Sequence, residues 1–238
     1  MNDRAHAHMI LQSVAGRRWL VAAALSLATA CSTLGSRPAT DGNRPADVAP
    51  DSLARAVLVD VRQLAPDIVV EARYATANNF TGAPLPGYEA NKVLLRRESA
   101  AALARVQHRA TGLGYSLKVF DGYRPVRATL AMMDWTKRVD REDLVRDGYI
   151  AARSRHNLGL AIDLTLVRRP DGRELEMGTP YDSFSEAAHT ANATGDVARN
   201  RQLLVQLMEG EGFISYDKEW WHFSFEVPTP ARFDLVIR

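Results

Sequence analysis

The sequence is poor in cysteine, and this scarcity limits the chemistry that is open to the protein. Cys31 is the only cysteine among 238 residues. A disulfide within the chain and a zinc site built from several cysteines are therefore both excluded. Any bound metal must be held by histidine, aspartate or glutamate side chains.

The chain also lacks an excess of charge of either sign. Its formal net charge is +2, from 30 lysines and arginines against 28 aspartates and glutamates. A nucleic-acid-binding protein needs a basic surface, so we expect no nucleic-acid partner. The length suits one hydrophobic core better than two.

No apolar run is long enough for a comfortable membrane span. An apolar run of 12 residues, 19–30, follows Arg17 and Arg18. A membrane span needs about 20 apolar residues. This pattern is typical of an export signal over residues 1–30, and the paired arginines also resemble a twin-arginine signal. Small residues precede Cys31 as in a lipobox, although Leu27 stands four positions before the cysteine rather than three. We expect lipidation at Cys31, with a plain cleaved signal as the alternative.

Residues 31–53 are rich in Ser, Pro, Asp and Gly, which predicts a flexible tether before a catalytic domain over residues 54–238. The expected location is a membrane surface facing the periplasm, reached through the lipid anchor, or otherwise the soluble periplasm. Ser32 rather than aspartate after the cysteine favours the outer membrane of a Gram-negative host. Nothing in the sequence fixes the oligomeric state.

The apolar pattern from residue 54 onward predicts mixed secondary structure. Strands are expected over residues 68–74, 117–120, 159–166 and 220–227, and helices over 98–107, from Val126 onward, and around 203–208. Loops are expected over residues 78–88 and 167–200. Because strands and helices do not alternate regularly, we expect a single α+β domain with a mainly antiparallel sheet and flanking helices.

A polar position stands out inside the strand expected over residues 159–166. Leucine and isoleucine alternate there with smaller residues and with Asp163. An ionised aspartate within a strand is costly unless it meets a cation or strong donors. His156 lies just before this strand, so the two side chains could converge on one metal ion.

A second polar pair lies near the end of the chain. Glu219 precedes His222 by three residues, so a regular strand would place them on opposite faces. A turn or a bulge at Glu219 is needed if both serve one site. Two histidines and one carboxylate leave an open position on Zn²⁺, and a nearby glutamate can act as a base. On spacing alone, structural histidines and a salt-bridged aspartate are the more common explanation.

Five motifs in order extend this interpretation. The segment from Ser154 to Asp163 follows the pattern S-x-H-x-x-G-x-A-x-D, and the segment from Glu219 to His222 follows E-x-W-H. Further agreement lies in residues 74–82, 121–125 and 177–182. Together they resemble the D-alanyl-D-alanine dipeptidases, the family of the vancomycin-resistance enzyme, over about residues 60–228.

The resemblance implies a zinc dipeptidase with one Zn²⁺ per chain, on the sheet. Its implied ligands are His156, Asp163 and His222, and its implied base is Glu219. Arg124 would stabilise the oxyanion that forms when water adds to the scissile carbonyl. The implied substrate contacts are Asp182 and Tyr74 at the dipeptide ammonium, and Ser154 elsewhere in the cavity.

Two other functions remain open at this point. The chain could be a zinc DD-carboxypeptidase or endopeptidase that acts on peptidoglycan stem peptides. It could also be a binding lipoprotein that keeps the metal site without turnover, although simple binding does not need Glu219. Because a resistance enzyme must act in the cytoplasm, an exported dipeptidase suggests cell-wall peptide turnover or scavenging.

Overall fold

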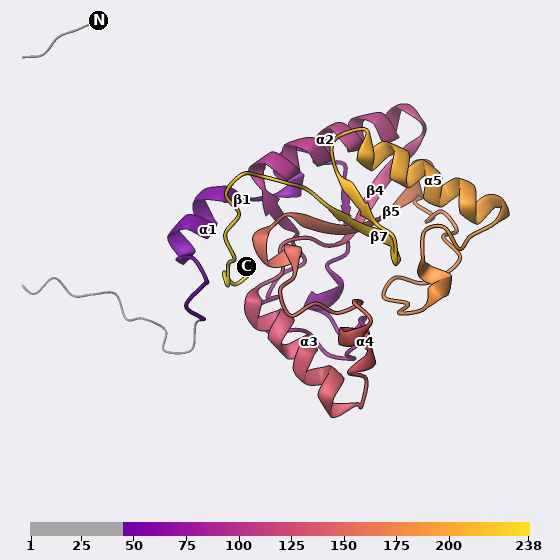
Figure 1. The fold of residues 1–238 in the computed structure, drawn as a ribbon. Coiled ribbons are helices and arrows are strands. Elements are labelled where there is room, and N and C mark those ends of the chain that lie inside the picture. Colours follow the sequence, from indigo (N-terminus) through magenta and orange to yellow (C-terminus); the bar gives the residue numbers. More distant parts are fainter. Residues whose placement is uncertain (1–44) are drawn as a thin grey trace, which may run out of the picture. The chain divides into compact units, whose positions relative to one another are not determined.

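A five-stranded sheet lies at the centre of the structure, a computed structural model that describes residues 45–238 (Figure 1). Its order is β2-β4-β5-β7-β6, and only the β2–β4 pair is parallel. The strands are β2 (Val69–Val70), β4 (Tyr115–Asp121), β5 (Ala161–Arg168), β6 (Ile214–Tyr216) and β7 (Glu219–Ser224). The predicted α+β domain with a mainly antiparallel sheet is confirmed.

Helices cover this sheet, as the sequence predicts. They are α1 (Asp51–Val57), α2 (Arg97–Gly112), α3 (Val126–Arg138), α4 (Asp143–Arg146) and α5 (Gly195–Glu209). In Figure 1, α2 and α5 run above the sheet while α3 and α4 lie below it. Leu103 and Val106 on α2 are fully buried, as expected from their spacing. No helix within residues 45–238 is long and apolar enough to cross a bilayer.

A small second sheet supports the segment that leads into β5. It pairs β1 (Leu58–Asp60) with β3 (Leu94–Arg96). The amide of Arg96 donates to the carbonyl of Gly159 at 2.9 Å. Gly159 has φ +67°, and a Cβ there would lie 2.5 Å from a Leu58 methyl group, so only glycine fits. Short 3-10 turns complete the fold at η1 (Val61–Gln63), η2 (Arg73–Ala75), η3 (Arg155–Leu158) and η4 (Glu186–Ala188).

The structure corrects several expected boundaries. The strand expected over residues 68–74 is only Val69–Val70, because the chain then turns into η2 and carries Tyr74 with it. The expected helix after Pro125 is α3. The spacing of Val126, Leu130 and Met133 predicts a shared buried face, but Leu130 faces outward with 46% of its surface exposed. The buried face of α3 contains Thr129 and Met132 instead.

The last residues of the expected tether, from residue 45 to 53, are described by the structure. Val48 is buried and bridges to Arg232, and α1 begins at Asp51. These residues therefore pack with the folded part. The signal, the lipobox and Cys31 lie outside the residues that the structure describes.

Candidate metal centre and active site

Backbone pairing brings the first two polar residues together. In the β5–β7 ladder, Asp163 lies directly opposite His222. Directly opposed residues share one face of a sheet with their Cβ atoms about 5 Å apart. His222 Nδ1 lies 2.9 Å from Asp163 Oδ1. The sheet register alone therefore places an imidazole against a carboxylate that is 2% exposed.

A capped 3-10 turn supplies the third residue. Ser154 caps η3 by accepting a hydrogen bond from the amide of His156 at 3.2 Å. The His156 Nδ1 lies 2.7 Å from the carbonyl of Gly122. Because a carbonyl only accepts, Nδ1 carries the proton and Nε2 keeps its lone pair free for a metal.

The three ligand atoms form a nearly regular triangle. His156 Nε2 lies 3.2 Å from His222 Nδ1 and 3.5 Å from Asp163 Oδ1, and the third side is 2.9 Å. In a tetrahedral zinc site with bonds of about 2.0–2.1 Å, neighbouring donors are about 3.3 Å apart. The donor types and the spacing both fit Zn²⁺. Among residues 45–238 this is the one set of three such groups that could hold a metal ion.

An irregular hairpin places Glu219 beside this triangle. The β6–β7 pairing shifts between Ser215 and Tyr216, so that Tyr216 pairs with Glu219 while Ser215 pairs with Phe223. Glu219 Oε2 lies 3.8 Å from His222 Nδ1, although a regular strand would separate them. The bulge required by the sequence interpretation is present.

Arg124 reaches the same centre from the turn after β4. Its Nη2 lies 2.7 Å from Asp121 Oδ2 and 3.7 Å from Asp163 Oδ2. Asp121 is 1% exposed and also accepts from the Tyr88 hydroxyl at 2.6 Å. Asp121 lies in the matched segment 121–125, but no role in the site is assigned to it from the sequence. Its position three residues before Arg124, at the end of a strand, was the available signal.

The opposite end of the cavity carries the residues expected to meet an ammonium group. The Tyr74 hydroxyl lies 3.1 Å from both oxygens of Asp182. Asp182 has φ +62°, which is a strained conformation for a residue with a side chain. Tyr181, which the sequence interpretation did not single out, donates to Asp163 Oδ2 at 2.9 Å. Its place in the matched segment 177–182, directly before Asp182, was the available signal.

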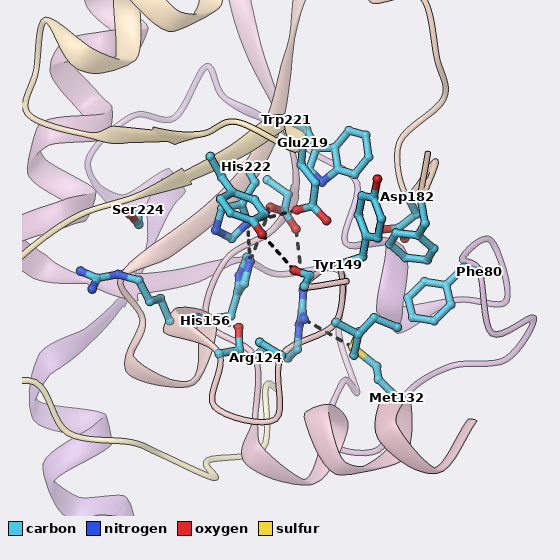
Figure 2. Close-up of a pocket in the computed structure, with 18 of the residues that line it drawn as sticks. Phe80, Arg124, Met132, Tyr149, His156, Asp182, Glu219, Trp221, His222 and Ser224 are labelled. Carbon is cyan, nitrogen blue, oxygen red and sulfur yellow. Dashed lines mark hydrogen bonds and ion pairs between the residues drawn. The ribbon is translucent and has the colours of Figure 1, made fainter. Parts of the chain in front are cut away.

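One cavity of about 390 Å³ unites these groups (Figure 2). All eight expected site residues in the described chain line it: Tyr74, Arg124, Ser154, His156, Asp163, Asp182, Glu219 and His222. Figure 2 shows His156 and His222 next to each other, with Asp182 across the cavity and Phe80 on the adjoining wall. The sequence thus predicted a set of residues that the fold brings together.

The electrostatics of this cavity favour positive ligands. Burial raises the pKa of Asp163, but the charges and hydrogen bonds of His156 and His222 outweigh burial and lower this pKa below its ordinary value. Burial, together with the charge of Asp163, raises the pKa of Glu219 and of Asp182 well above the ordinary range. Carboxylates crowded in this way are stabilised in ionised form by a cation among them.

Comparison with known proteins gives consistent matches over this domain. The profile of the D-ala-D-ala dipeptidase family matches residues 54–231. A D-alanyl-D-alanine dipeptidase of Enterococcus faecium is 39% identical over 186 residues, covering 71% of this chain and 92% of the relative. The enzyme of that name in Streptomyces coelicolor is 37% identical, covering 74% and 96%. The one in Escherichia coli is 37% identical, covering 75% and 89%.

Proposed function

The chain belongs to the D-Ala-D-Ala dipeptidase family, and from that premise we propose that it hydrolyses the peptide bond of D-alanyl-D-alanine. The observation that carries this proposal is the triangle of His156, Asp163 and His222 with Glu219 beside it. A metallopeptidase needs three protein ligands, an open metal position and a separate base. His156, Asp163 and His222 provide the three ligands and Glu219 provides the base, which leaves the fourth metal position open for water or substrate.

The proposed cofactor is one Zn²⁺ per chain, held by His156 Nε2, Asp163 Oδ1 and His222 Nδ1. Zinc in such a site supplies Lewis acidity, which makes water more acidic and polarises a carbonyl. The ligand set contains no thiolate and is mixed nitrogen and oxygen, as in known catalytic zinc sites. The Gly122 carbonyl holds the ring of His156 in the orientation that this role requires.

Glu219 is the proposed general base. Its side chain is 8% exposed and points into the cavity at the triangle. There it takes the proton from the attacking water and passes it to the departing amine. Arg124, fixed by Asp121, offers a preorganised cation to the oxyanion that develops on the scissile carbonyl.

Asp182 and Tyr74 are the proposed partners of the substrate ammonium. An ammonium at Asp182 offsets both the burial and the repulsion from Asp163 that raise the pKa of this carboxyl. Ser154 lines the cavity while its hydroxyl caps η3, so its proposed role is to shape the wall next to His156.

The dipeptidase proposal is tested against the carboxypeptidase alternative by comparing substrates. The full chain should show a higher kcat/KM on D-Ala-D-Ala than on its N-acetyl form or on a wall pentapeptide. Asp182 favours a free ammonium, and an acetyl group removes that charge and adds bulk. A higher kcat/KM on the pentapeptide would support zinc peptide hydrolysis but contradict the dipeptide as the substrate.

We further propose that the enzyme is exported and anchored by lipid on Cys31, so that it serves cell-wall peptide turnover or scavenging. A short apolar run that ends at the only cysteine supports this proposal. Several acyl chains together give stable anchoring, at about 0.8 kcal/mol for each buried CH₂ group. Cys31→Ser should abolish labelling by a radioactive fatty acid, and a wild-type chain that fractionates as a soluble protein would contradict the anchor.

A further inference from the structure

Two tyrosine hydroxyls form a continuous hydrogen-bonded chain between the two ends of the cavity. Tyr181 Oη lies 2.9 Å from Asp163 Oδ2 and 3.0 Å from Tyr74 Oη. Tyr74 Oη in turn lies 3.1 Å from each oxygen of Asp182. Tyr74 is 2% exposed and Tyr181 is 9% exposed, so bulk water competes little for these hydroxyls. The chain therefore joins a metal ligand to the carboxylate proposed to meet the ammonium.

When Asp182 is ionised, as it is when it meets an ammonium, this chain has fewer protons than links. Each tyrosine hydroxyl has one proton to donate, whereas three contacts connect the four groups. The ionised carboxylate of Asp163 is a stronger acceptor than a hydroxyl, so Tyr181 donates to it. Tyr74 then has to divide one proton between Asp182 and Tyr181.

We propose that Tyr181 is a positioning residue, which fixes the Asp163 carboxylate for the metal and receives through Tyr74 the effect of ammonium binding at Asp182. This inference rests on the proposed function and names a further residue that it needs.

The first part follows from how the two oxygens of Asp163 are used. Oδ2 accepts from Tyr181 and faces Arg124 at 3.7 Å. Oδ1 faces His222 at 2.9 Å and His156 at 3.5 Å. Holding Oδ2 in place turns Oδ1 toward the histidines and keeps the carboxylate a ligand through one oxygen. Partners of this kind orient metal ligands and are commonly worth about 10- to 100-fold in metal affinity.

The second part follows from what a substrate ammonium brings. An ammonium supplies its own donors to Asp182, so Tyr74 is no longer needed there. Its hydroxyl can rotate and donate to Tyr181, and a hydroxyl that accepts a hydrogen bond donates more strongly in turn. Binding of a free N-terminus thereby strengthens the hold of Tyr181 on Asp163, whereas an N-blocked peptide leaves it unchanged.

Tyr181→Phe removes this link while it preserves the ring that stacks on Phe120 at 4.7 Å. Tyr123→Phe is the matched control, because Tyr123 is 1% exposed and donates to the Leu235 carbonyl at 3.1 Å outside the cavity. Zinc affinity is measured on the full chain by competition with a chromophoric chelator. We expect Tyr181→Phe to bind zinc about 10- to 100-fold more weakly, and Tyr123→Phe to match wild type. Equal zinc affinity in wild type and Tyr181→Phe would overturn the positioning role.

Kinetics at saturating zinc test the relay. In Tyr181→Phe, Asp182 and Tyr74 still face the substrate ammonium, so KM for D-Ala-D-Ala should stay near the wild-type value while kcat falls about 10-fold. The ratio of kcat on the free dipeptide to kcat on the N-acetyl form should shrink as well. A rise in KM with unchanged kcat would show that Tyr181 serves binding only and would refute the relay. A wild type that neither binds zinc nor cleaves the dipeptide would instead refute the proposed function itself.

Discussion

The two ends of the cavity are built in different ways. The metal end rests on regular backbone pairing, since Asp163 and His222 lie opposite each other on β5 and β7. The ammonium end rests on η2 and on the long segment between β5 and α5, which carry Tyr74 and Asp182. The sheet therefore places two of the three proposed metal ligands, while irregular segments hold the residues proposed to select the substrate.

The irregular end has its own support from a buried arginine. Arg201 on α5 is 2% exposed and donates to the carbonyls of Met177, Ala187 and His189 over distances of 2.6–2.9 Å. These carbonyls lie on both sides of Asp182 in the sequence. The Arg201 guanidinium thus holds this irregular segment in place, whereas β5–β7 pairing holds the metal end.

The largest effect is expected at the metal end of the cavity, when the proposed base Glu219 is removed. Glu219→Gln keeps the shape of the side chain and all three metal ligands, so the chain should retain zinc. We expect kcat on D-Ala-D-Ala to fall by about 10²- to 10⁴-fold, because proton removal from water is lost. Steady-state kinetics and metal analysis of the same sample measure both effects.

The matched control is Glu226→Gln, a change in the same terminal segment at an exposed side chain whose contact is Arg155 at 3.6 Å. This variant should match wild type. Near-normal turnover in Glu219→Gln would mean that another group acts as the base.

A change at the ammonium end should alter selectivity more than chemistry. Asp182→Asn removes the charge that faces the substrate ammonium, and a buried charge left unpaired costs several kcal/mol. With about 3–5 kcal/mol at stake, discrimination against N-acetyl-D-Ala-D-Ala of roughly 10²- to 10⁴-fold should largely disappear. The ratio of the two kcat/KM values is the measurement, with exposed Asp196→Asn as control. Unchanged discrimination would place ammonium recognition elsewhere.

A smaller effect on substrate binding is expected when Arg201, which supports the segment around Asp182, is replaced. Arg201→Met keeps the length of the side chain but removes the donor from three carbonyls, which should lower the free energy of unfolding by about 1–3 kcal/mol. KM should rise while zinc content stays at the wild-type level. Thermal melts and kinetics test this, and Arg199→Met on the same helix, an exposed partner of Asp196, is the control. Loss of zinc in Arg201→Met would show that the two ends are not separate.

The metal end was predictable from the sequence because its signals are local. The alternation around Asp163 identifies a strand, and a charged residue inside that strand demands a partner. The three-residue interval between Glu219 and His222 demands a turn or a bulge, and the β6–β7 pairing is irregular there. A charged residue inside a strand and an interval that breaks the strand alternation are both unfavourable in a regular sheet, so each one indicated a functional site.

The ammonium end was less accessible because its contacts join distant segments. Tyr74 meets Asp182 across 108 residues of sequence, and only the resemblance suggested the pair. Tyr74 was also expected on a strand, although it lies on η2. Asp121 and Tyr181 lie in matched segments but had no expected role, because each contacts a site residue in a way that only the fold creates.

The central claim is that the triangle of His156, Asp163 and His222 holds the zinc ion on which dipeptide hydrolysis depends. Zinc titration into chelator-treated full chain, with D-Ala-D-Ala turnover followed at each step, tests it most directly. The account predicts no turnover without metal, a linear rise with added zinc, and a plateau at one equivalent per chain that His222→Ala fails to reach. Full activity in the metal-free chain, or in His222→Ala, would contradict it.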